Sequence, residues 1–237
     1  MNEDEKRVVI VTGGSQGIGA GLVAAYRRRG WSVVTSARTI RPSLDPDLLV
    51  VAGDVADAAT DDRIVAGALD RFGRIDSLVN NAGIFISKPF TDYSDEDYAA
   101  IVAVNLTGFF RLTQRVVREM LKRGRGHVVN VTTTLVDHAD SRVPSVLVSL
   151  TKGGLAAATR SLAIEYATRG IRVNAVALGV IQTPAHPPGS YESQARRQPL
   201  GHVGQVDDVV DGVLYLESSP FVTGEILHID GGQVAGR

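Results

Sequence analysis

Residues 8–19 read Val8-Val9-Ile10-Val11-Thr12-Gly13-Gly14-Ser15-Gln16-Gly17-Ile18-Gly19, and this segment indicates the fold class most directly. An apolar run leads into a glycine-rich turn, and a helical segment, Ala20 to Arg29, follows directly. Glycine permits a tight turn and lets main-chain N–H groups approach a pyrophosphate at the positive end of the helix dipole. This context predicts a nucleotide-binding turn. The alternative is a strand-to-helix turn that binds no ligand.

Short β-branched runs alternate with helical segments along the rest of the chain. This alternation is typical of strand-helix-strand units around a parallel sheet that helices cover on both faces. It predicts an α/β fold of Rossmann type, with one doubly wound, parallel, seven-stranded sheet flanked by helices, in a single domain over residues 1–237. The expected strands are Val8–Thr12, Trp31–Ser36, Leu48–Ala52, Ser77–Asn80, His127–Thr132, Arg172–Ala177 and Glu225–Ile229.

Two longer segments stand out between the expected strands. The spacing of apolar residues predicts a helix from about Asp95 to Lys122, with Ser94 and the acidic residues after it marking its start. Residues 182–201 are rich in Pro, Gly and polar side chains and lie between a strand and a helix. They are a candidate lid over a substrate.

Composition excludes several classes of partner. Lys and Arg total 25 against 26 for Asp and Glu, so no basic field draws the chain to nucleic acid or anionic lipid. No apolar stretch approaches the roughly 18 residues of a membrane span, and a cytoplasmic protein is expected. The absence of cysteine excludes disulfides and thiolate zinc sites, and five scattered histidines give metal binding little support.

Further motifs accompany the glycine turn: Asn80-Asn81-Ala82-Gly83, Asn105, Lys152 and the closing Asp230-Gly231-Gly232. Together with the spacing of the glycines, they resemble the short-chain dehydrogenase/reductase family over nearly the whole chain. The resemblance implies a nicotinamide cofactor, redox chemistry on a small molecule and a homodimer or homotetramer. Small residues at 153–158 would let helices of two subunits approach, although they could equally pack within one subunit.

The resemblance also indicates which residues would hold the cofactor. They lie in the glycine turn, after the second, third, fourth and sixth strands, and on the helix that carries Lys152. The expected contacts are Gly13, Ser15, Gln16, Gly17, Ile18, Gly19, Arg38, Asp54, Val55, Asn81, Ala82, Gly83, Lys152, Ile181 and Thr183.

The end of the second strand indicates which dinucleotide is preferred. Ala37 stands where an NAD-dependent member has an aspartate, and Arg38 can hold a 2′-phosphate by charge-assisted hydrogen bonds. NADP(H) is therefore the expected cofactor. Two alternatives stay open: Arg38 as a solvated loop residue, and Asp54 as the cap of the next helix.

The catalytic tyrosine of the family has no counterpart. Its position, four residues before Lys152, is Val148, and no Tyr occurs between Tyr98 and Tyr166. Valine has no proton to offer a substrate. The missing acid concerns proton transfer and does not bear on cofactor binding.

The family's other catalytic positions have counterparts in this chain. The resemblance assigns Lys152 and Asn105 to the family's lysine and asparagine, and Thr133 to its serine, with the register among residues 132–134 left open. Candidates for a substitute proton donor are His138, after the threonine run, and Tyr191, His186 and His202, in or beside the candidate lid. His138 is the best of them, because an unperturbed imidazole titrates near pH 6.5. The alternative for His138 is a solvated loop residue, and for Lys152 a solvated helix lysine.

Two functions are compatible with this pattern. The first is an NADP(H)-dependent oxidoreductase that acts on a small carbonyl, imine or alkene with a proton donor other than tyrosine. The second is a dinucleotide-binding protein of impaired catalysis that serves as a sensor, partner subunit or non-redox scaffold. The substrate itself is not readable, because loop side chains vary independently of the cofactor site.

Overall fold

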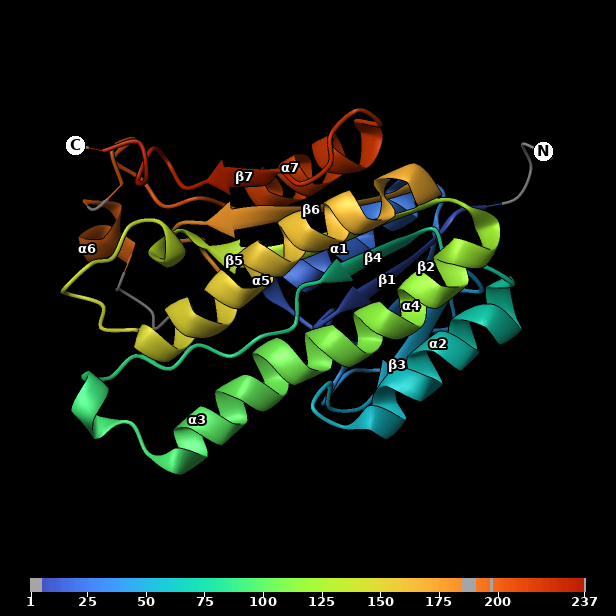
Figure 1. The fold of residues 1–237 in the computed structure, drawn as a ribbon, viewed down its shortest axis with the longest axis horizontal. Coiled ribbons are helices and arrows are strands. Elements are labelled where there is room, and N and C mark those ends of the chain that lie inside the picture. Colours follow the sequence, from blue (N-terminus) through green and yellow to red (C-terminus); the bar gives the residue numbers. More distant parts are fainter. Residues whose placement is uncertain (1–5, 185–190, 197, 237) are drawn as a thin grey trace.

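The structure is a computed structural model that describes residues 6–184, 191–196 and 198–236. Seven parallel strands form one sheet in the order β3-β2-β1-β4-β5-β6-β7 (Figure 1). The sheet confirms the predicted fold class, and each strand ends within one residue of its predicted limit. The strands are β1 Val8–Thr12, β2 Ser32–Ala37, β3 Leu48–Ala52, β4 Ser77–Asn80, β5 Gly126–Thr133, β6 Ile171–Leu178 and β7 Ile226–Ile229.

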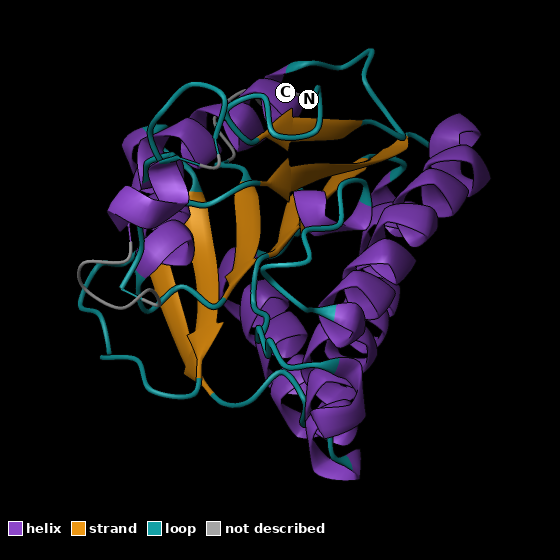
Figure 2. Ribbon diagram, turned by 90° about the vertical axis from the view of Figure 1, so that its left-hand side faces the viewer, coloured by secondary structure: helices purple, strands orange, loops and turns teal. Residues whose placement is uncertain are grey.

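Helices cover both faces of the sheet (Figure 2). α1 and α7 pack on one face, where Leu22 and Val213 join one buried cluster. α2, α4 and α5 pack on the other, where Ile64, Leu112 and Ala163 join a second. The described helices are α1 Gly17–Arg28, α2 Ala58–Phe72, α3 Asp95–Val102, α4 Phe109–Arg123, α5 Val146–Tyr166, α6 Tyr191–Ala195 and α7 Val206–Ser218.

The strand order reverses direction between β1 and β4. The chain builds outward from β1 through β2 to β3, then returns to the other side of β1 with β4. In a doubly wound sheet, a crevice opens at the carboxyl ends of the strands where the order reverses. The fold therefore places a binding site where β1 and β4 end.

The predicted helix Asp95–Lys122 is correct in extent but not uniform. It begins with a capping box in which Ser94 Oγ accepts from the N–H of Asp97 at 3.2 Å and the Asp97 carboxylate accepts from the N–H of Ser94 at 3.0 Å. A π-helical segment, η2 Ala103–Gly108, then separates α3 from α4. The sequence pattern did not indicate this change of pitch.

The candidate lid is described only in part, because residues 185–190 and 197 lie outside the described residues. Within it, the Tyr191 hydroxyl at the start of α6 donates to the carbonyl of Thr183 at 2.8 Å. The lid and the single domain stay predictions. In the part of the chain that is described, no helix combines the length and apolar character needed to cross a membrane.

Candidate active site and cofactor cleft

A cavity of about 620 Å³ opens along the carboxyl ends of β1, β2 and β4. It brings together most of the residues predicted to bind a cofactor, whereas Lys152 and Ile181 are buried outside its lining. The predicted residues that line it are Gly13, Ser15, Gln16, Gly17, Ile18, Gly19, Arg38, Asp54, Val55, Asn81, Ala82, Gly83 and Thr183.

The glycine turn forms one wall of this cavity. Gly13 and Gly17 have positive φ angles of 73° and 53°, which glycine adopts without strain. A Cβ on Gly19 would lie 2.1 Å from the carbonyl oxygen of Gly13, so only glycine fits there. No side chain caps the start of α1, and its first turn has no acidic residue. The free N–H groups and the close approach of the backbone fit the pyrophosphate of a dinucleotide.

The ends of β2 and β3 form the second wall. Ser36 is fully buried, and its hydroxyl has no partner among the described residues. Arg38 is exposed and forms no ion pair within the described structure. Asp54 accepts from the N–H of Ala56 at 2.9 Å, and the cap of α2 is Asp57 instead. An unpartnered guanidinium and an unpartnered hydroxyl at this wall fit the ribose 2′-substituent of a dinucleotide.

Thr12 fixes the third wall, the segment after β4. Its hydroxyl accepts from the N–H groups of Asn81 and Ala82 at 3.1 and 3.0 Å. The Asn81 amide donates to the carbonyls of Thr12 and Gly13 at 2.8 and 3.3 Å. The glycine turn and residues 81–83 therefore form one hydrogen-bonded unit. Sequence reasoning missed Thr12, although it directly precedes the glycines.

Asn105, in the π-helical segment, holds the next residue of the same wall. Its side-chain oxygen accepts from the N–H of Ile84 at 2.9 Å, and its amide donates to the carbonyl of Ile84 at 3.0 Å. The amide also approaches the Thr151 hydroxyl at 3.3 Å. π-Helical turns often occur at functional sites. Here the two hydrogen bonds to Ile84 fix the position of the loop between β4 and α3.

Lys152 lies on α5 behind this wall. It is 9% exposed, and its Nζ donates to the carbonyl of Val131 on β5 at 2.8 Å. A Cβ placed on Gly83 would lie 3.2 Å from Nζ and 3.2 Å from Asn105 Oδ1. Burial lowers the pKa of Lys152 to about 8. The position of Lys152 excludes a solvated helix lysine.

Val148 lies one turn before Lys152 and is 2% exposed. It packs with Ile101 and Leu147 in a small apolar cluster against which Ile84 and Tyr93 also pack. The phenol that packs against this cluster, that of Tyr93, donates its hydroxyl proton to the carbonyl of Ile86 at 2.8 Å.

The three threonines at the end of β5 differ in their surroundings. Thr132 and Thr134 are buried, and their hydroxyls donate to the carbonyls of Val176 and Leu178 at 3.1 and 3.2 Å. Thr133 is half-buried, and its hydroxyl accepts from the N–H of Leu135 at 3.3 Å. Since it is the least buried of the three, Thr133 remains the candidate for the family's serine position.

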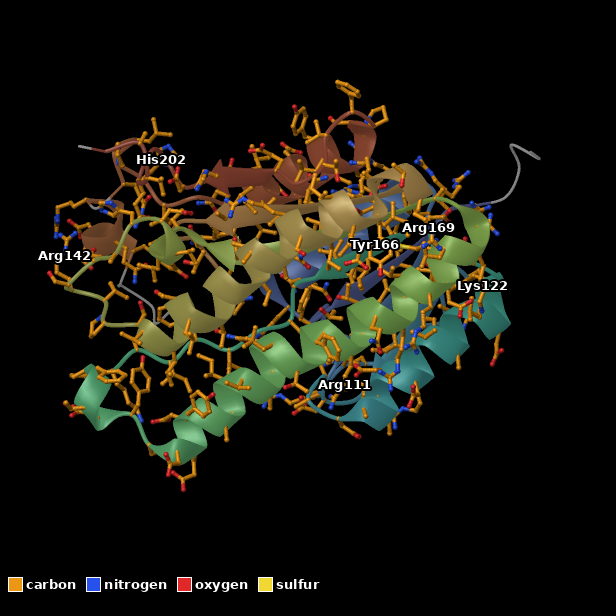
Figure 3. The ribbon with its side chains drawn as sticks, viewed as in Figure 1. Arg111, Lys122, Arg142, Tyr166, Arg169 and His202 are labelled. Carbon is orange, nitrogen blue, oxygen red and sulfur yellow. The ribbon has the colours of Figure 1, made fainter. Side chains whose placement is uncertain are left out.

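Of the titratable groups predicted from the loops, those that the structure describes do not line the cavity. His138 is exposed just after β5, and its N–H donates to the carbonyl of Thr134 at 2.8 Å. Arg142 and His202 lie at the end of the molecule toward which the strands point (Figure 3). His186 lies outside the described residues. The role of His138 stays a hypothesis.

Ile181 and Thr183, two of the predicted cofactor contacts, follow the end of β6. Ile181 is buried in the core and bridges to Gly204, while the Thr183 side chain lies 3.4 Å from the point where a Cβ on Gly17 would stand. No group of three metal-binding side chains occurs among the described residues. The lining residues that were not predicted are neighbours of predicted ones: Ser36, Ala37, Thr39, Gly53, Ile84, Val104 and Pro184.

Comparison with known proteins identifies relatives over the whole chain. A protein-family model described as enoyl-(acyl carrier protein) reductase matches residues 13–233. A 3-oxoacyl-(acyl-carrier-protein) reductase of Thermotoga maritima is 34% identical, with 97% of this chain and 98% of the relative covered. The BbsD subunit of a succinyl-CoA derivative dehydrogenase of Thauera aromatica is 33% identical, with 97% of each chain covered.

Solved structures agree with the fold. ElxO with NADP bound superposes with a TM-score of 0.91 at 28% identity, covering 98% of this chain and all of the other. A 3-ketoacyl-(acyl-carrier-protein) reductase from Brucella melitensis, complexed with NADH, has a TM-score of 0.89 at 28% identity, covering 97% of this chain and 99% of the other.

Proposed function

This chain belongs to the short-chain dehydrogenase/reductase family, and from that premise we propose that it is an NADP(H)-dependent oxidoreductase. Its substrate is a small carbonyl, imine or activated alkene, and its proton donor is not a tyrosine. The observation that carries the proposal is the cavity whose walls are the glycine turn, the ends of β2 and β3 and residues 81–83. The bound nicotinamide supplies or accepts the hydride, and the protein holds it in place.

Arg38 supports NADP(H) over NAD(H). Its guanidinium reaches the cavity beside Ala37, without an ion pair in the described structure. A carboxylate, which would repel a 2′-phosphate, is absent at position 37. The relative ElxO is known with NADP bound, whereas the Brucella melitensis reductase is known with NADH. Because these two relatives are known with different dinucleotides, the preference of this chain for NADP(H) is best tested at Arg38.

Because Val148 cannot act as a general acid, we favour a substrate whose reduction depends little on general-acid catalysis. A positioned general acid typically contributes 10²–10⁴ in rate, roughly 3–5 kcal/mol, so reduction of an ordinary ketone should be slow. An imine that is already protonated in solution carries its own proton. An activated alkene develops its negative charge over a conjugated group and depends less on an acid at one oxygen.

Val148 also supports a second function, that of a dinucleotide-binding protein with impaired turnover. Its burial among Ile101 and Leu147 leaves no polar group in the place of the phenol. A relative is named as a subunit of a dehydrogenase, so a role as partner subunit has a precedent within the matches.

The two functions are separated by NADPH consumption with a panel of ketones, imines and activated alkenes, beside NADPH binding measured by calorimetry. Turnover on any class supports the oxidoreductase. Loss of that turnover in His138→Ala but not in Tyr191→Phe would identify His138 as the donor. Tight NADPH binding without turnover on the whole panel would favour the second function.

Cofactor preference is tested with Arg38→Ala and the matched variant Arg41→Ala. Loss of a charge-assisted hydrogen bond costs about 1.5–3 kcal/mol, so Arg38→Ala should weaken NADPH binding roughly tenfold to hundredfold and leave NADH binding nearly unchanged. Arg41→Ala should have a smaller effect, because Arg41 lies outside the cavity lining. Equal affinity of the unmodified protein for both dinucleotides would contradict the role of Arg38.

Association into a homodimer or homotetramer, and a cytoplasmic location, stay proposals. Val146, Leu150 and Ile164 lie on one face of α5 and are 47%, 56% and 77% exposed. An apolar face of this kind supports self-association.

A further inference from the structure

We propose that Lys152 itself donates the proton to the reduced substrate, in place of the missing phenol, at the Gly83 end of the cavity. The inference rests on the proposed oxidoreductase function. It gives Lys152 direct contact with the reacting atoms, in addition to a contact with the cofactor.

The first support is the position of the ammonium group. Gly83 lines the cavity, and Nζ of Lys152 lies 3.2 Å from the point where a Cβ on Gly83 would stand. Because Gly83 has no side chain, only main-chain atoms of that residue stand between Nζ and the cavity. Proton transfer requires a heavy-atom distance of about 3 Å, directly or through one bridging water, and a water beside Gly83 would provide that bridge.

The second support is the unused donor capacity of Lys152. An ammonium has three N–H donors, and only the bond to the carbonyl of Val131 is formed within the described structure. The side chain is nevertheless more than nine-tenths buried. Two buried N–H donors without acceptors are costly unless a ligand accepts from them.

The third support is elimination. The titratable side chains that line the cavity are Arg38 and Asp54, at the ends of β2 and β3. At the other end, the lining consists of residues that do not titrate near neutrality: Asn81, Ala82, Gly83, Ile84, Val104, Thr183 and Pro184. This leaves two described groups near that end that can release a proton: Lys152, directly behind Gly83, and Tyr191, whose hydroxyl already donates its proton to the carbonyl of Thr183 at 2.8 Å.

The surroundings suit the ammonium to this task. Val131 on β5 accepts from Nζ, Gly83 of the β4 loop lies beside Nζ, and Asn105 Oδ1 of η2 lies 3.2 Å from the same Gly83 Cβ position. None of these three residues titrates. Burial is the only cause of the lowered pKa of about 8, with no carboxylate raising it again. Most molecules therefore carry the proton at pH 7, and the group releases it more readily than an exposed lysine does.

Atoms and electrons balance in this step. In reduction, the substrate carbon would receive the hydride that the reduced nicotinamide supplies, and the π pair of its C=O bond, or of a C=N bond that is not already protonated, takes a proton from Nζ. One N–H bond of the ammonium breaks as the O–H or N–H bond of the product forms. The neutral amine then regains a proton from water. Val148 has no atom that could carry this proton between Nζ and the substrate.

The test compares Lys152→Arg and Lys152→Ala with Lys122→Arg, a matched change at an exposed lysine of α4. Lys152→Arg keeps a cation and donors but does not release a proton near neutral pH. It should bind NADPH within about threefold of the unmodified protein and lose roughly 10²-fold or more in kcat. Lys122→Arg should match the unmodified protein. Turnover of the unmodified protein should fall above pH about 8, as the ammonium is lost.

Lys152→Ala keeps the inference testable if arginine does not fit. Added methylamine or ethylamine should restore turnover with a rate that depends on the pKa of the amine, whereas guanidine should restore none. Full turnover of Lys152→Arg, rescue by guanidine equal to that by amines, or loss of turnover in His138→Ala would overturn the inference while the oxidoreductase stands. Absence of turnover in the unmodified protein would instead defeat the proposed function itself.

Discussion

Val148 and Lys152 lie one helical turn apart on α5, so their side chains occupy neighbouring positions on one face of the helix. The lysine reaches the back of the cavity wall through its four-carbon stem, while the valine ends within an apolar cluster. At the scale of single residues, Lys152 therefore carries both the proposed cofactor contact and the proposed proton transfer, whereas Val148 carries neither. Each can be changed without removing the other.

Val148→Tyr should raise the turnover of an unactivated ketone by roughly 10²-fold or more, because it places a phenol beside the Lys152 ammonium. Val148→Phe is the matched control, since it adds the ring without the hydroxyl. Both variants should unfold more easily by about 1–3 kcal/mol, the usual cost of overpacking a core site. The measurements are kcat/KM for a ketone and thermal unfolding. Equal gains in the two variants would show that the hydroxyl is not the cause.

The sequence predicted the gap at position 148 and the family positions of Asn105 and Lys152, because these depend only on residue type and spacing. It did not predict what the side chains contact. The amide of Asn105 is engaged by Ile84, 21 residues away along the chain, and the unpartnered hydroxyl of Ser36 is visible only once β2 is buried. Hydrogen-bond partners brought together by tertiary packing leave no local pattern in a sequence.

At the scale of elements, the turn between β1 and α1 is the most tightly constrained part of the site. The N–H of Gly13 donates to the carbonyl of Ser36 at 2.7 Å, which ties the turn to the end of β2. A Cβ on Gly19 would meet the carbonyl of Gly13 and the Asn81 amide, at 2.1 and 2.7 Å. The backbone after β1, the start of α1 and the Asn81 side chain of the β4 loop thus meet at one glycine.

Gly19→Ala should abolish measurable binding of NADPH, because the added methyl group displaces the turn from its bonds to residues 81–83. The matched control is Gly153→Ala on α5, where the nearest atom to the new Cβ is a Val136 methyl at 3.7 Å. Alanine favours a helix over glycine by about 1 kcal/mol, so the control should be as stable as the unmodified protein or more so. Calorimetric titration with NADPH checks both. Unchanged affinity in Gly19→Ala would contradict a pyrophosphate site at this turn.

The elements themselves were largely predictable, because apolar runs and helical spacing are properties of short segments. The π-helical turn Ala103–Gly108 was not. A Cβ on Gly108, the last residue of η2, would lie 2.7 Å from the carbonyl of Val55, so the backbone of η2 approaches the β3–α2 loop closely at this glycine. The change of helical pitch occurs where Gly108 contacts Val55, which is 53 residues away along the chain. The spacing of residues within one helix does not indicate such a contact.

At the scale of the whole molecule, a buried polar network lies at the opposite end of the sheet from the cavity. The N–H of Glu225 donates to Asn174 Oδ1 at 3.0 Å, and Asn174 Nδ2 donates to the carbonyl of Val222 at 3.0 Å. This orientation turns Nδ2 toward His127 Nε2, which must accept, at 3.1 Å. His127 is therefore neutral, and its Nδ1–H donates to Glu217 at 3.1 Å.

Glu217 connects this network across the fold. The same carboxylate oxygen accepts from the hydroxyls of Tyr26 on α1 and Ser77 on β4, at 3.2 and 2.8 Å. The network thus joins α1, α7 and three strands around one buried carboxylate. Burial alone would raise the pKa of Glu217, but the bonds from His127 and Ser77 and the charge of Arg172 outweigh it and hold the pKa below its usual value.

This network predicts that the free energy of unfolding falls as the pH is lowered from 7 to 5. Burial lowers the pKa of His127 despite the bond to Glu217, so the folded state stays neutral where the unfolded chain takes up a proton, below pH about 6.5. One proton gives a slope of at most about 1.4 kcal/mol per pH unit. Urea unfolding across this range should show a smaller slope in His127→Gln, which has no titrating ring, whereas His138→Gln at an exposed position should keep the original slope. An unchanged slope in His127→Gln would show that the buried histidine takes up no proton on unfolding and that other groups set the acid sensitivity.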